Sequence, residues 1–503
     1  MRRTVSSLPL LPLALALNSA FAADIEPALS AKARTQSRVD ALIVFADQSR
    51  PLLAPMDAKA DYRERRRVLV DALRARAQVQ QAGVRQWLDA NAIVYRPYWI
   101  ANTIAAKLSA SDLAVLARRD DIARVAADPP LSARLPRPAA GTPAPQAVES
   151  IAWGVSKINA PAAWAAGYTG QDVVIAGEDT GYQWDHPALQ LQYRGWDGSA
   201  ADHDHNWHDS IHDSVGNPCG NDSTEPCDDY GHGTHTAGTF AGDDGGTHQI
   251  GVAPGAKWIG CRNMDVGTGT PARYIECMQW MLAPTDLAGE NPDPDLAPDV
   301  INNSWGCPPE EGCTVGDELQ AAVDSVVAGG IFFAAAAAND GPGCSTITAP
   351  PAIYDSSFVV GATDNTDDMA GFSSRGPVVG VGLIRPDLSA PGVNITSSWP
   401  PNTYIQENGT SMATPHVAGT VALILSAVPA LKGHPDQVAE ILRATAVTDG
   451  ITDSSNSGCG GLTVSDWPNY QAGYGRLDAW AAVQAALAGE IAADTVFADG
   501  FDD

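Results

Sequence analysis

Three short stretches of the sequence carry side chains that could act together as a nucleophile, a base and an orienting acid. VVIAGEDTG places Asp179 directly after an apolar run, GHGTHTAGT places His232 between two glycines, and GTSMATPHVAG places Ser411 ahead of small and apolar residues. A serine hydroxyl is a poor nucleophile until a base removes its proton, and histidine does this near neutral pH. A buried carboxylate can fix the imidazole tautomer and stabilise the imidazolium. Together the three side chains predict covalent catalysis by an activated serine.

Taken alone, each of these residues also has an ordinary structural interpretation. An aspartate after a strand usually belongs to a turn, a lone histidine is more often structural, and GTS before a helix can simply cap it. The surroundings of Ser411 favour catalysis, because Gly409 and Thr410 allow a sharp turn and keep the approach open. We expect Pro415 to lie in the first turn of the helix, where its missing N–H is not needed, and His416 to be structural.

From residue 153 onward, short apolar strands alternate with helices. Strands are predicted at 172–177, 257–262, 299–304, 331–338 and 357–362, and helices at 270–283, 315–330 and 475–487. This alternation is typical of an α/β fold with a mostly parallel sheet and helices on both faces. Functional groups gather at the carboxyl ends of the strands in such sheets, and Asp179 follows the first of them.

Residues 23–134 follow a different pattern. A strand is predicted at 38–45, a helix at 61–88, one or two strands at 93–108, a capped helix at 109–119 and a last strand at 121–128. This order fits a small α+β domain of the ferredoxin-like, split βαβ type. The next segment, 135–150, is rich in proline and alanine, so we expect an exposed linker that a protease could cut.

The first 22 residues predict export. Arg2 and Arg3 precede the apolar run LPLLPLALAL and the small-x-small site Ala20-Phe21-Ala22, which is the pattern of a signal peptide cut after residue 22. The apolar run is shorter than the roughly 20 residues that span a membrane. We therefore expect a secreted protein, with the periplasm as a transit compartment left open.

The eight cysteines fit an oxidising compartment, since their number is even and all lie between residues 219 and 459. Eight cysteines allow 105 pairings. Short spacing favours Cys219–Cys227, Cys261–Cys277 and Cys307–Cys313, which leaves Cys344–Cys459. A zinc site is the alternative, but the sequence has no CxxC.

Charge is distributed unevenly along the chain. Residues 23–150 carry nineteen Lys and Arg against fourteen Asp and Glu, whereas residues 151–503 carry ten against forty-five. The two halves, at +5 and −35, could attract each other, although the excess acid most simply keeps a secreted protein soluble. The acidic half offers no basic patch for nucleic acid, and no segment is long and apolar enough to predict a membrane partner. The tail 488–503 is also acidic.

With these motifs in place, the chain resembles the subtilisin-like serine proteases, or subtilases, over roughly residues 150–487. EDTG, GHGTHTAGT and GTSMATPHVAG carry the resemblance, NNSWG at 302–306 and AAAAND at 335–340 follow in the family's order, and the stretch beginning WGVSKINAPAAW is similar to the bacillopeptidase F branch. The order Asp, His, Ser is one of the known triad orders, for which subtilisin is the worked example. The front domain resembles the family's inhibitory propeptide.

The resemblance implies a role for each matching residue. Asp179 would orient His232, the general base and acid, and Ser411 would be the nucleophile. The side chain of Asn339 and the backbone N–H of Ser411 would stabilise the oxyanion, as free N–H groups at a helix start can do. Ser304, Trp305 and Gly306 would bind the substrate backbone beside the first specificity pocket. This chain departs from the family at Ala338, where glycine is usual before the asparagine.

The resemblance also implies a biological setting. The protein would be a secreted serine endopeptidase of the subtilisin-like fold, acting on proteins and peptides with no cofactor required for catalysis. Residues 23–134 would act as an intramolecular chaperone and inhibitor, which self-cleavage near the linker would release. A structural calcium ion remains open, and no nucleic acid or membrane partner is expected.

Other readings of the same residues remain to be tested. One is a subtilase-like scaffold that binds protein without cutting it. Another is a serine-carboxyl peptidase, in which Glu178 would take part and activity would peak in acid. His232 and His235 could instead ligate a metal, but the sequence lacks HExxH. The stretch 202–213, DHDHNWHDSIHD, could bind calcium or a transition metal, but its spacing is not that of an EF-hand, which favours a solvated loop.

Overall fold

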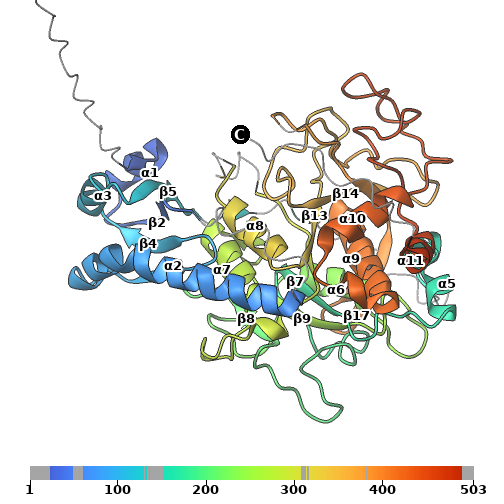
Figure 1. Cartoon of the computed structure of the whole chain (residues 1–503), viewed down its shortest axis with the longest axis horizontal. Helices are drawn as coiled ribbons and strands as arrows, with labels where there is room; N and C mark the ends of the chain where they lie inside the picture. The colour runs from blue at the N-terminus through green and yellow to red at the C-terminus, as the bar shows by residue number, and fades with distance from the viewer. Residues whose placement is uncertain are drawn as a thin grey trace, which may run out of the picture.

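The computed structural model describes residues 23–48, 61–129, 131–132, 135, 151–307, 313, 316–380 and 382–489. The predicted signal peptide, residues 136–150 of the predicted linker and residues 490–503 of the predicted tail lie outside the described residues. Two units are visible in Figure 1, a front unit of residues 23–129 and a larger back unit of residues 151–489.

A seven-stranded sheet forms the centre of the back unit. Its strands run in the order β15-β14-β13-β12-β7-β9-β8, and neighbouring strands are parallel. The strands are β7 (Val174–Asp179), β8 (Trp207–Asp209), β9 (Lys257–Arg262), β12 (Val300–Asn303), β13 (Phe332–Ala336), β14 (Phe358–Thr363) and β15 (Leu388–Pro391). All five predicted strands are present, and the predicted α/β fold is confirmed.

Helices and short strands surround this sheet. The helices are α4 (Trp153–Lys157), α5 (Ala160–Ala165), α6 (His232–Ala241), α7 (Pro271–Leu282), α8 (Gln320–Ala328), α9 (Thr410–Ala427), α10 (Pro435–Ala444) and α11 (Ala479–Ala488), with 3-10 turns η2 (Pro294–Leu296) and η4 (Pro429–Leu431). The remaining strands are β10 (Met264–Asp265), β11 (Thr268–Gly269), β16 (Ile395–Trp399) and β17 (Thr403–Glu407). The helix predicted from residue 315 begins later, at Gln320.

The two faces of the sheet pack into separate cores, because successive strand residues point to opposite faces. Val300 and Ala334 belong to the core that includes α6 and α9, whereas Ile301 and Phe333 belong to the core that includes α7 and α8. All four predicted disulfides are formed: Cys219–Cys227, Cys261–Cys277, Cys307–Cys313 and Cys344–Cys459. In the described part of the chain, no helix has both the length and the apolar composition needed to cross a membrane.

The front unit is a five-stranded sheet in the order β1-β5-β2-β4-β3, with the helices α1, α2 and α3. Its elements are β1 (Asp24–Ile25), α1 (Pro27–Ala33), β2 (Val39–Phe45), α2 (Tyr62–Ala90), β3 (Tyr95–Tyr98), β4 (Thr103–Leu108), α3 (Ala110–Leu116) and β5 (Ile122–Ala127). The order β5-β2-β4-β3 is the predicted split βαβ arrangement. Ser109 caps α3 in a capping box with Asp112, whereas β1 and α1 were not predicted.

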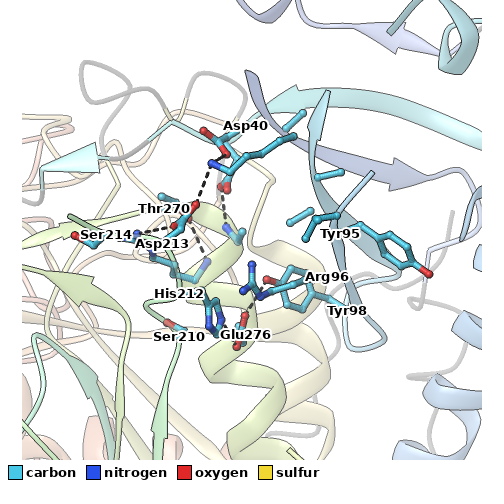
Figure 2. Close-up of a pocket in the computed structure, with 18 of the residues that line it drawn as sticks. Asp40, Tyr95, Arg96, Tyr98, Ser210, His212, Asp213, Ser214, Thr270 and Glu276 are labelled. Carbon is cyan, nitrogen blue, oxygen red and sulfur yellow. Dashed lines mark hydrogen bonds and ion pairs between the residues drawn. The ribbon is translucent and has the colours of Figure 1, made fainter. Parts of the chain in front are cut away.

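The front unit packs on α7 of the back unit, and a cavity of about 340 Å³, lined by charged and apolar side chains, lies between them (Figure 2). The hydroxyl of Tyr98 donates to Glu276 Oε2 at 2.9 Å, and Glu276 Oε1 also hydrogen-bonds to His208 and His212. Figure 2 shows Tyr98 and His212 reaching Glu276 from the two units. At Glu276 the two units are therefore joined by hydrogen bonds between ionisable groups.

Asp128 joins this interface at the first turn of α7. Its Oδ1 accepts from the backbone N–H of Ala272 at 2.9 Å, and its side chain is 7% exposed. Burial raises the pKa of Asp128 to about 7, although the Ala272 N–H, Thr270 and the charge of Arg273 oppose the rise, and the charge of Asp40 adds to it. Asp128 thus binds its proton more tightly when the two units are packed together.

We expect the association of the two units to weaken as the pH rises from about 4 to about 7 and to level off above that, because an unburied aspartate ionises near pH ~3.9 whereas buried Asp128 ionises near 7. Asp128→Asn keeps an acceptor for the Ala272 N–H and should remove this part of the pH dependence. Thermal unfolding from pH 5 to 9, in a Ser411→Ala background, measures the effect. The exposed Asp89→Asn on α2 is the control, and an unchanged slope in Asp128→Asn would contradict the prediction.

Candidate active site

Asp179 and His232 meet where a strand ends and a helix begins, since Asp179 is the last residue of β7 and His232 the first of α6. The Nδ1 of His232 lies 2.7 Å from Oδ1 and 2.9 Å from Oδ2 of Asp179, and both side chains are about 1% exposed. The Nε2 of His232 is buried without a hydrogen-bond partner among the described residues. With Nδ1 bound to the carboxylate, Nε2 is the ring nitrogen that can accept a proton.

A further aspartate, Asp228, shapes the turn into α6. Its Oδ1 accepts from the hydroxyl of Thr180 at 2.9 Å and from the N–H of Gly231 at 2.7 Å, and its Oδ2 accepts from the hydroxyl of Thr234 at 2.6 Å. Gly231 has φ +103°, which glycine adopts without strain. Asp228 therefore ties the end of β7 to the start of α6. The sequence analysis did not identify Asp228. The available signal was the acidic pair Asp228-Asp229, which lies just upstream of the GHGTHTAGT motif.

The surroundings of His232 favour its charged form. Burial lowers the pKa of His232, but the charge and hydrogen bond of Asp179, with the charges of Asp228 and Glu407, outweigh burial and raise that pKa above 6.5. Glu407 ends β17, is 2% exposed and has a pKa raised to about 7, chiefly by burial. Glu407 was another residue that sequence reasoning missed. These carboxylates would stabilise an imidazolium formed during proton transfer.

Ser411 lies in the first turn of α9 and is paired with Ser304, just beyond β12. The Ser411 hydroxyl donates to the carbonyl of Ser304 at 2.7 Å, and the Ser304 hydroxyl donates to the carbonyl of Ser411 at 2.9 Å. β7 and β12 are parallel neighbours, so Asp179 at the end of β7 and Ser304 just beyond β12 place the starts of α6 and α9 at the same end of the back unit. In this structure, then, the Ser411 hydroxyl is bonded to a carbonyl oxygen, and the Nε2 of His232 is left open.

The placement of Pro415 was predicted wrongly. It lies at the sixth residue of α9 and not in the first turn, so its missing N–H would leave the carbonyl of Ser411 without its helical partner. The hydroxyl of Ser304 donates to that carbonyl instead. His416 is structural, as predicted: its Nδ1 hydrogen-bonds to the carbonyl of Met412 at 2.8 Å, and burial lowers its pKa to about 4.

Asn339 lies next to the start of α9. Its Oδ1 accepts from the N–H of Thr410 at 2.9 Å and from the hydroxyl of Thr410 at 3.1 Å. Because the amide oxygen is held by α9, the amide NH₂ group faces away from it. Ala338, the residue that departs from the family, has φ +77°. It therefore occupies the left-handed conformation for which glycine would be the ordinary choice.

A small pocket joins these groups. It is lined by Ser304, Trp305, Gly306, Ala336, Ala338, Asn339, Asp340, Ala349, Thr410 and Ser411, together with Leu135. The indole N–H of Trp305 donates to the carbonyl of Glu178 at 3.0 Å, which fixes Trp305 beside β7. The structure thus brings Ser304, Trp305, Gly306, Asn339 and Ser411 to one place.

The chain segment before the predicted linker also enters this region. Residues Leu131–Ser132 form the unpredicted strand β6, which pairs antiparallel with β11, and Leu135 lines the pocket and is only 8% exposed. The prediction of an exposed linker is therefore wrong at its first residue, because Leu135 finds an apolar pocket in the back unit.

The alternative assignments are not supported by side-chain placement. The Nε2 of His235 hydrogen-bonds to the carbonyl of Ile395 at 3.0 Å, and burial lowers the pKa of His235 to about 3. Glu178 is buried and hydrogen-bonds to Asn263, with a pKa raised well above its usual range by burial. Across the ranges that the structure describes, no group of three or more His, Cys, Asp or Glu side chains could hold a metal ion.

Known proteins are similar to this chain in sequence. A model described as the subtilase family matches residues 170–472. Bacillopeptidase F of Bacillus subtilis (strain 168) is 36% identical over 454 residues, which are 86% of this chain and 29% of that protein. Subtilisin E of the same strain is 37% identical over 300 residues, 59% of this chain and 66% of that protein.

The subtilisin of Bacillus pumilus is 37% identical over 300 residues, which are 59% of this chain and 92% of that protein. The chain therefore spans less than a third of bacillopeptidase F but nearly all of this shorter relative. A family match over more than half of the sequence, joined to a fold with a large parallel sheet, shows that the chain belongs to the subtilase family.

Proposed function

We propose that the chain is a secreted serine endopeptidase made as a self-processed zymogen, with Asp179, His232 and Ser411 as its catalytic residues. The observation that carries the proposal is the buried pair of Asp179 and His232, whose open Nε2 lies at the end of the back unit that also presents Ser411 and Asn339. The relatives named subtilisin and bacillopeptidase F support the same activity.

In the proposed mechanism, the Nε2 of His232 takes the proton of the Ser411 hydroxyl as Ser411 Oγ attacks the peptide carbonyl carbon. Asp179 keeps the proton on Nδ1 and stabilises the imidazolium. The NH₂ group of Asn339 and the N–H of Ser411 donate to the oxyanion. The imidazolium then protonates the leaving amine, and water activated by His232 hydrolyses the acyl-enzyme. The residues need no cofactor for these steps, and a structural calcium ion stays a prediction.

The front unit would be the inhibitor of this site. β6 pairs with β11 as an extended peptide does when it adds to a strand. Leu135 lies in the pocket beside Ser411, where the side chain preceding a cut bond would be held. The small residues Ala336, Ala338 and Ala349 leave room for a leucine-sized side chain. We therefore infer a preference for apolar residues before the cut bond.

Ser411→Ala should abolish both casein digestion and self-processing of the full-length chain. No other hydroxyl would be placed to give its proton to His232 and attack the peptide bond. A serine-directed phosphonate should label Ser411 in the wild type, as mass spectrometry of tryptic peptides would show. Ser426→Ala, at the far end of α9, should keep full activity. Binding of casein without cleavage by the wild type would favour the non-cutting scaffold instead.

The acid limb of kcat/KM should have its midpoint above pH 6.5, because the pKa of His232 is raised and only neutral His232 accepts the proton. Activity is then lost as the pH falls through that pKa.

Asp179→Asn should lower kcat by about 10⁴-fold. Initial rates on a peptide substrate from about pH 2 to 10 measure both effects, and an optimum near pH 3–4 would point to serine-carboxyl peptidase chemistry.

Ala338→Gly should raise the free energy of unfolding by about 1 kcal/mol, because alanine pays ~1–2 kcal/mol in the left-handed conformation and glycine loses part of that gain to chain entropy. Ala337→Gly, at a neighbouring buried position without a positive φ, should instead destabilise the protein. Thermal unfolding of both variants in the Ser411→Ala background makes the comparison. A lower melting temperature for Ala338→Gly would contradict the idea that the positive φ of Ala338 destabilises the protein.

A further inference from the structure

Helix α2 is longer than its own unit requires. It spans 29 residues, or about 43 Å at 1.5 Å per residue. Its second half supplies Val84 and Leu88 to the core of the front unit, but Leu69, Val70 and Leu73 belong to the core around α7 and α8 of the back unit. Figure 1 shows α2 extending out of the front unit along the back unit. The first half of α2 is therefore an interface element.

Arg66 is the polar centre of that interface. It is 2% exposed, its Nε donates to the carbonyl of Gly329 at 2.7 Å, and its Nη1 donates to the carbonyl of Pro294 at 3.3 Å. Gly329 is the C-cap of α8, where carbonyl groups point outward and carry partial negative charge. A planar guanidinium can reach two such carbonyls at once. Burial lowers the pKa of Arg66, and the charge of Asp299 opposes this.

Two flanking contacts extend the site on either side of Arg66. Arg65 donates from Nη2 to the carbonyl of Gly433 at 3.1 Å, and Tyr62 packs so closely on Gly433 that a Cβ at Gly433 would collide with the Cβ of Tyr62. Arg67 pairs with Asp295 at 3.3 Å, but this pair is exposed and adds little. We call Tyr62, Arg65, Arg66, Leu69, Val70 and Leu73 the α2 anchor.

The α2 anchor lies at the opposite edge of the sheet from the candidate active site. η2 and Asp299 precede β12, and Gly329 precedes β13, so the contacts of Arg66 are at the amino ends of these strands. Ser304 and Asn339 follow the same two strands, at their carboxyl ends. A parallel strand of four or five residues separates the edges by about 15 Å. The anchor therefore contacts a surface distinct from the substrate cleft.

We propose that the α2 anchor binds an exosite on the back unit, formed around the carbonyls of Pro294, Gly329 and Gly433. This attachment, added to those at α7 and at the cleft, sets how long the cleaved front unit stays bound. The inference rests on the proposed zymogen function. The front unit would then hold the enzyme at both edges of the sheet, through β6 and Leu135 at the cleft and through α2 behind it. Two linked attachments dissociate far more slowly than either alone.

The test compares full-length wild type with Arg66→Ala, measuring the lag before activity appears as the chain processes itself. A hydrogen-bonded charged donor is worth ~1.5–3 kcal/mol, so we expect the lag to shorten by roughly tenfold to hundredfold. Once fully active, kcat and KM should equal the wild-type values, because Arg66 lies on the released fragment. Gel filtration after cleavage should show the two fragments together in the wild type and apart in Arg66→Ala.

Arg66→Lys and Arg74→Ala are the matched variants. Arg74→Ala removes an exposed arginine from the same helix and should leave the lag unchanged. Arg66→Lys keeps a positive charge but loses the planar guanidinium that reaches two carbonyls, so it should shorten the lag by less than Arg66→Ala does. If Arg66→Ala is not recovered folded, Arg66→Lys is the variant to compare with the wild type. An unchanged lag and co-elution in both Arg66 variants would overturn the exosite. A wild-type chain that never becomes active would instead count against the proposed function.

Discussion

The hydrogen bond between the buried carboxylate of Asp179 and Nδ1 of His232 is the interaction on which the rest of the site depends. A buried charge is tolerated only when it is well paired, and at about 1% exposure Asp179 has almost no contact with water. The parallel sheet, the turn held by Asp228 and the start of α6 together keep this pair in register. If the pair were displaced, Ser411 and Asn339 would have no base beside them to accept a proton.

On the other side of the site, the structure depends on how one backbone carbonyl finds a hydrogen-bond donor. A proline deep in the first half of α9 frees the carbonyl of Ser411, and Ser304 supplies the missing donor. Ser304, just beyond β12, therefore supports the helix that carries Ser411, and its own carbonyl accepts from the Ser411 hydroxyl. The segment just beyond β12 and the start of α9 are in this way joined as one hydrogen-bonded unit.

The sequence predicted the elements whose signals are local. The five strands, the capped start of α3 and the four disulfides follow from apolar runs, a Ser-x-x-Asp box and cysteine spacing. The motifs identified the groups around Asp179, His232 and Ser411, although their roles stay proposals. Pro415 was misplaced because a sequence does not reveal which turn of a helix a residue occupies.

Features that depend on distant partners were not predictable in the same way. Strand β6 has only two residues and exists because β11 pairs with it. Leu135 sits in a proline-rich stretch, and its burial depends on a pocket built more than 160 residues later. The burial of Glu407 and Arg66 likewise depends on tertiary packing, since glutamate and arginine are ordinarily surface residues.

The distribution of cysteines has a consequence for how the two units separate. All eight lie between residues 219 and 459, and every disulfide closes a loop within the back unit. Only the polypeptide backbone joins the units covalently. A single cut in the backbone would therefore let the two units separate without any reductant. After such a cut the back unit would keep four cross-links, whereas the front unit would have none and would be the easier of the two to unfold and degrade.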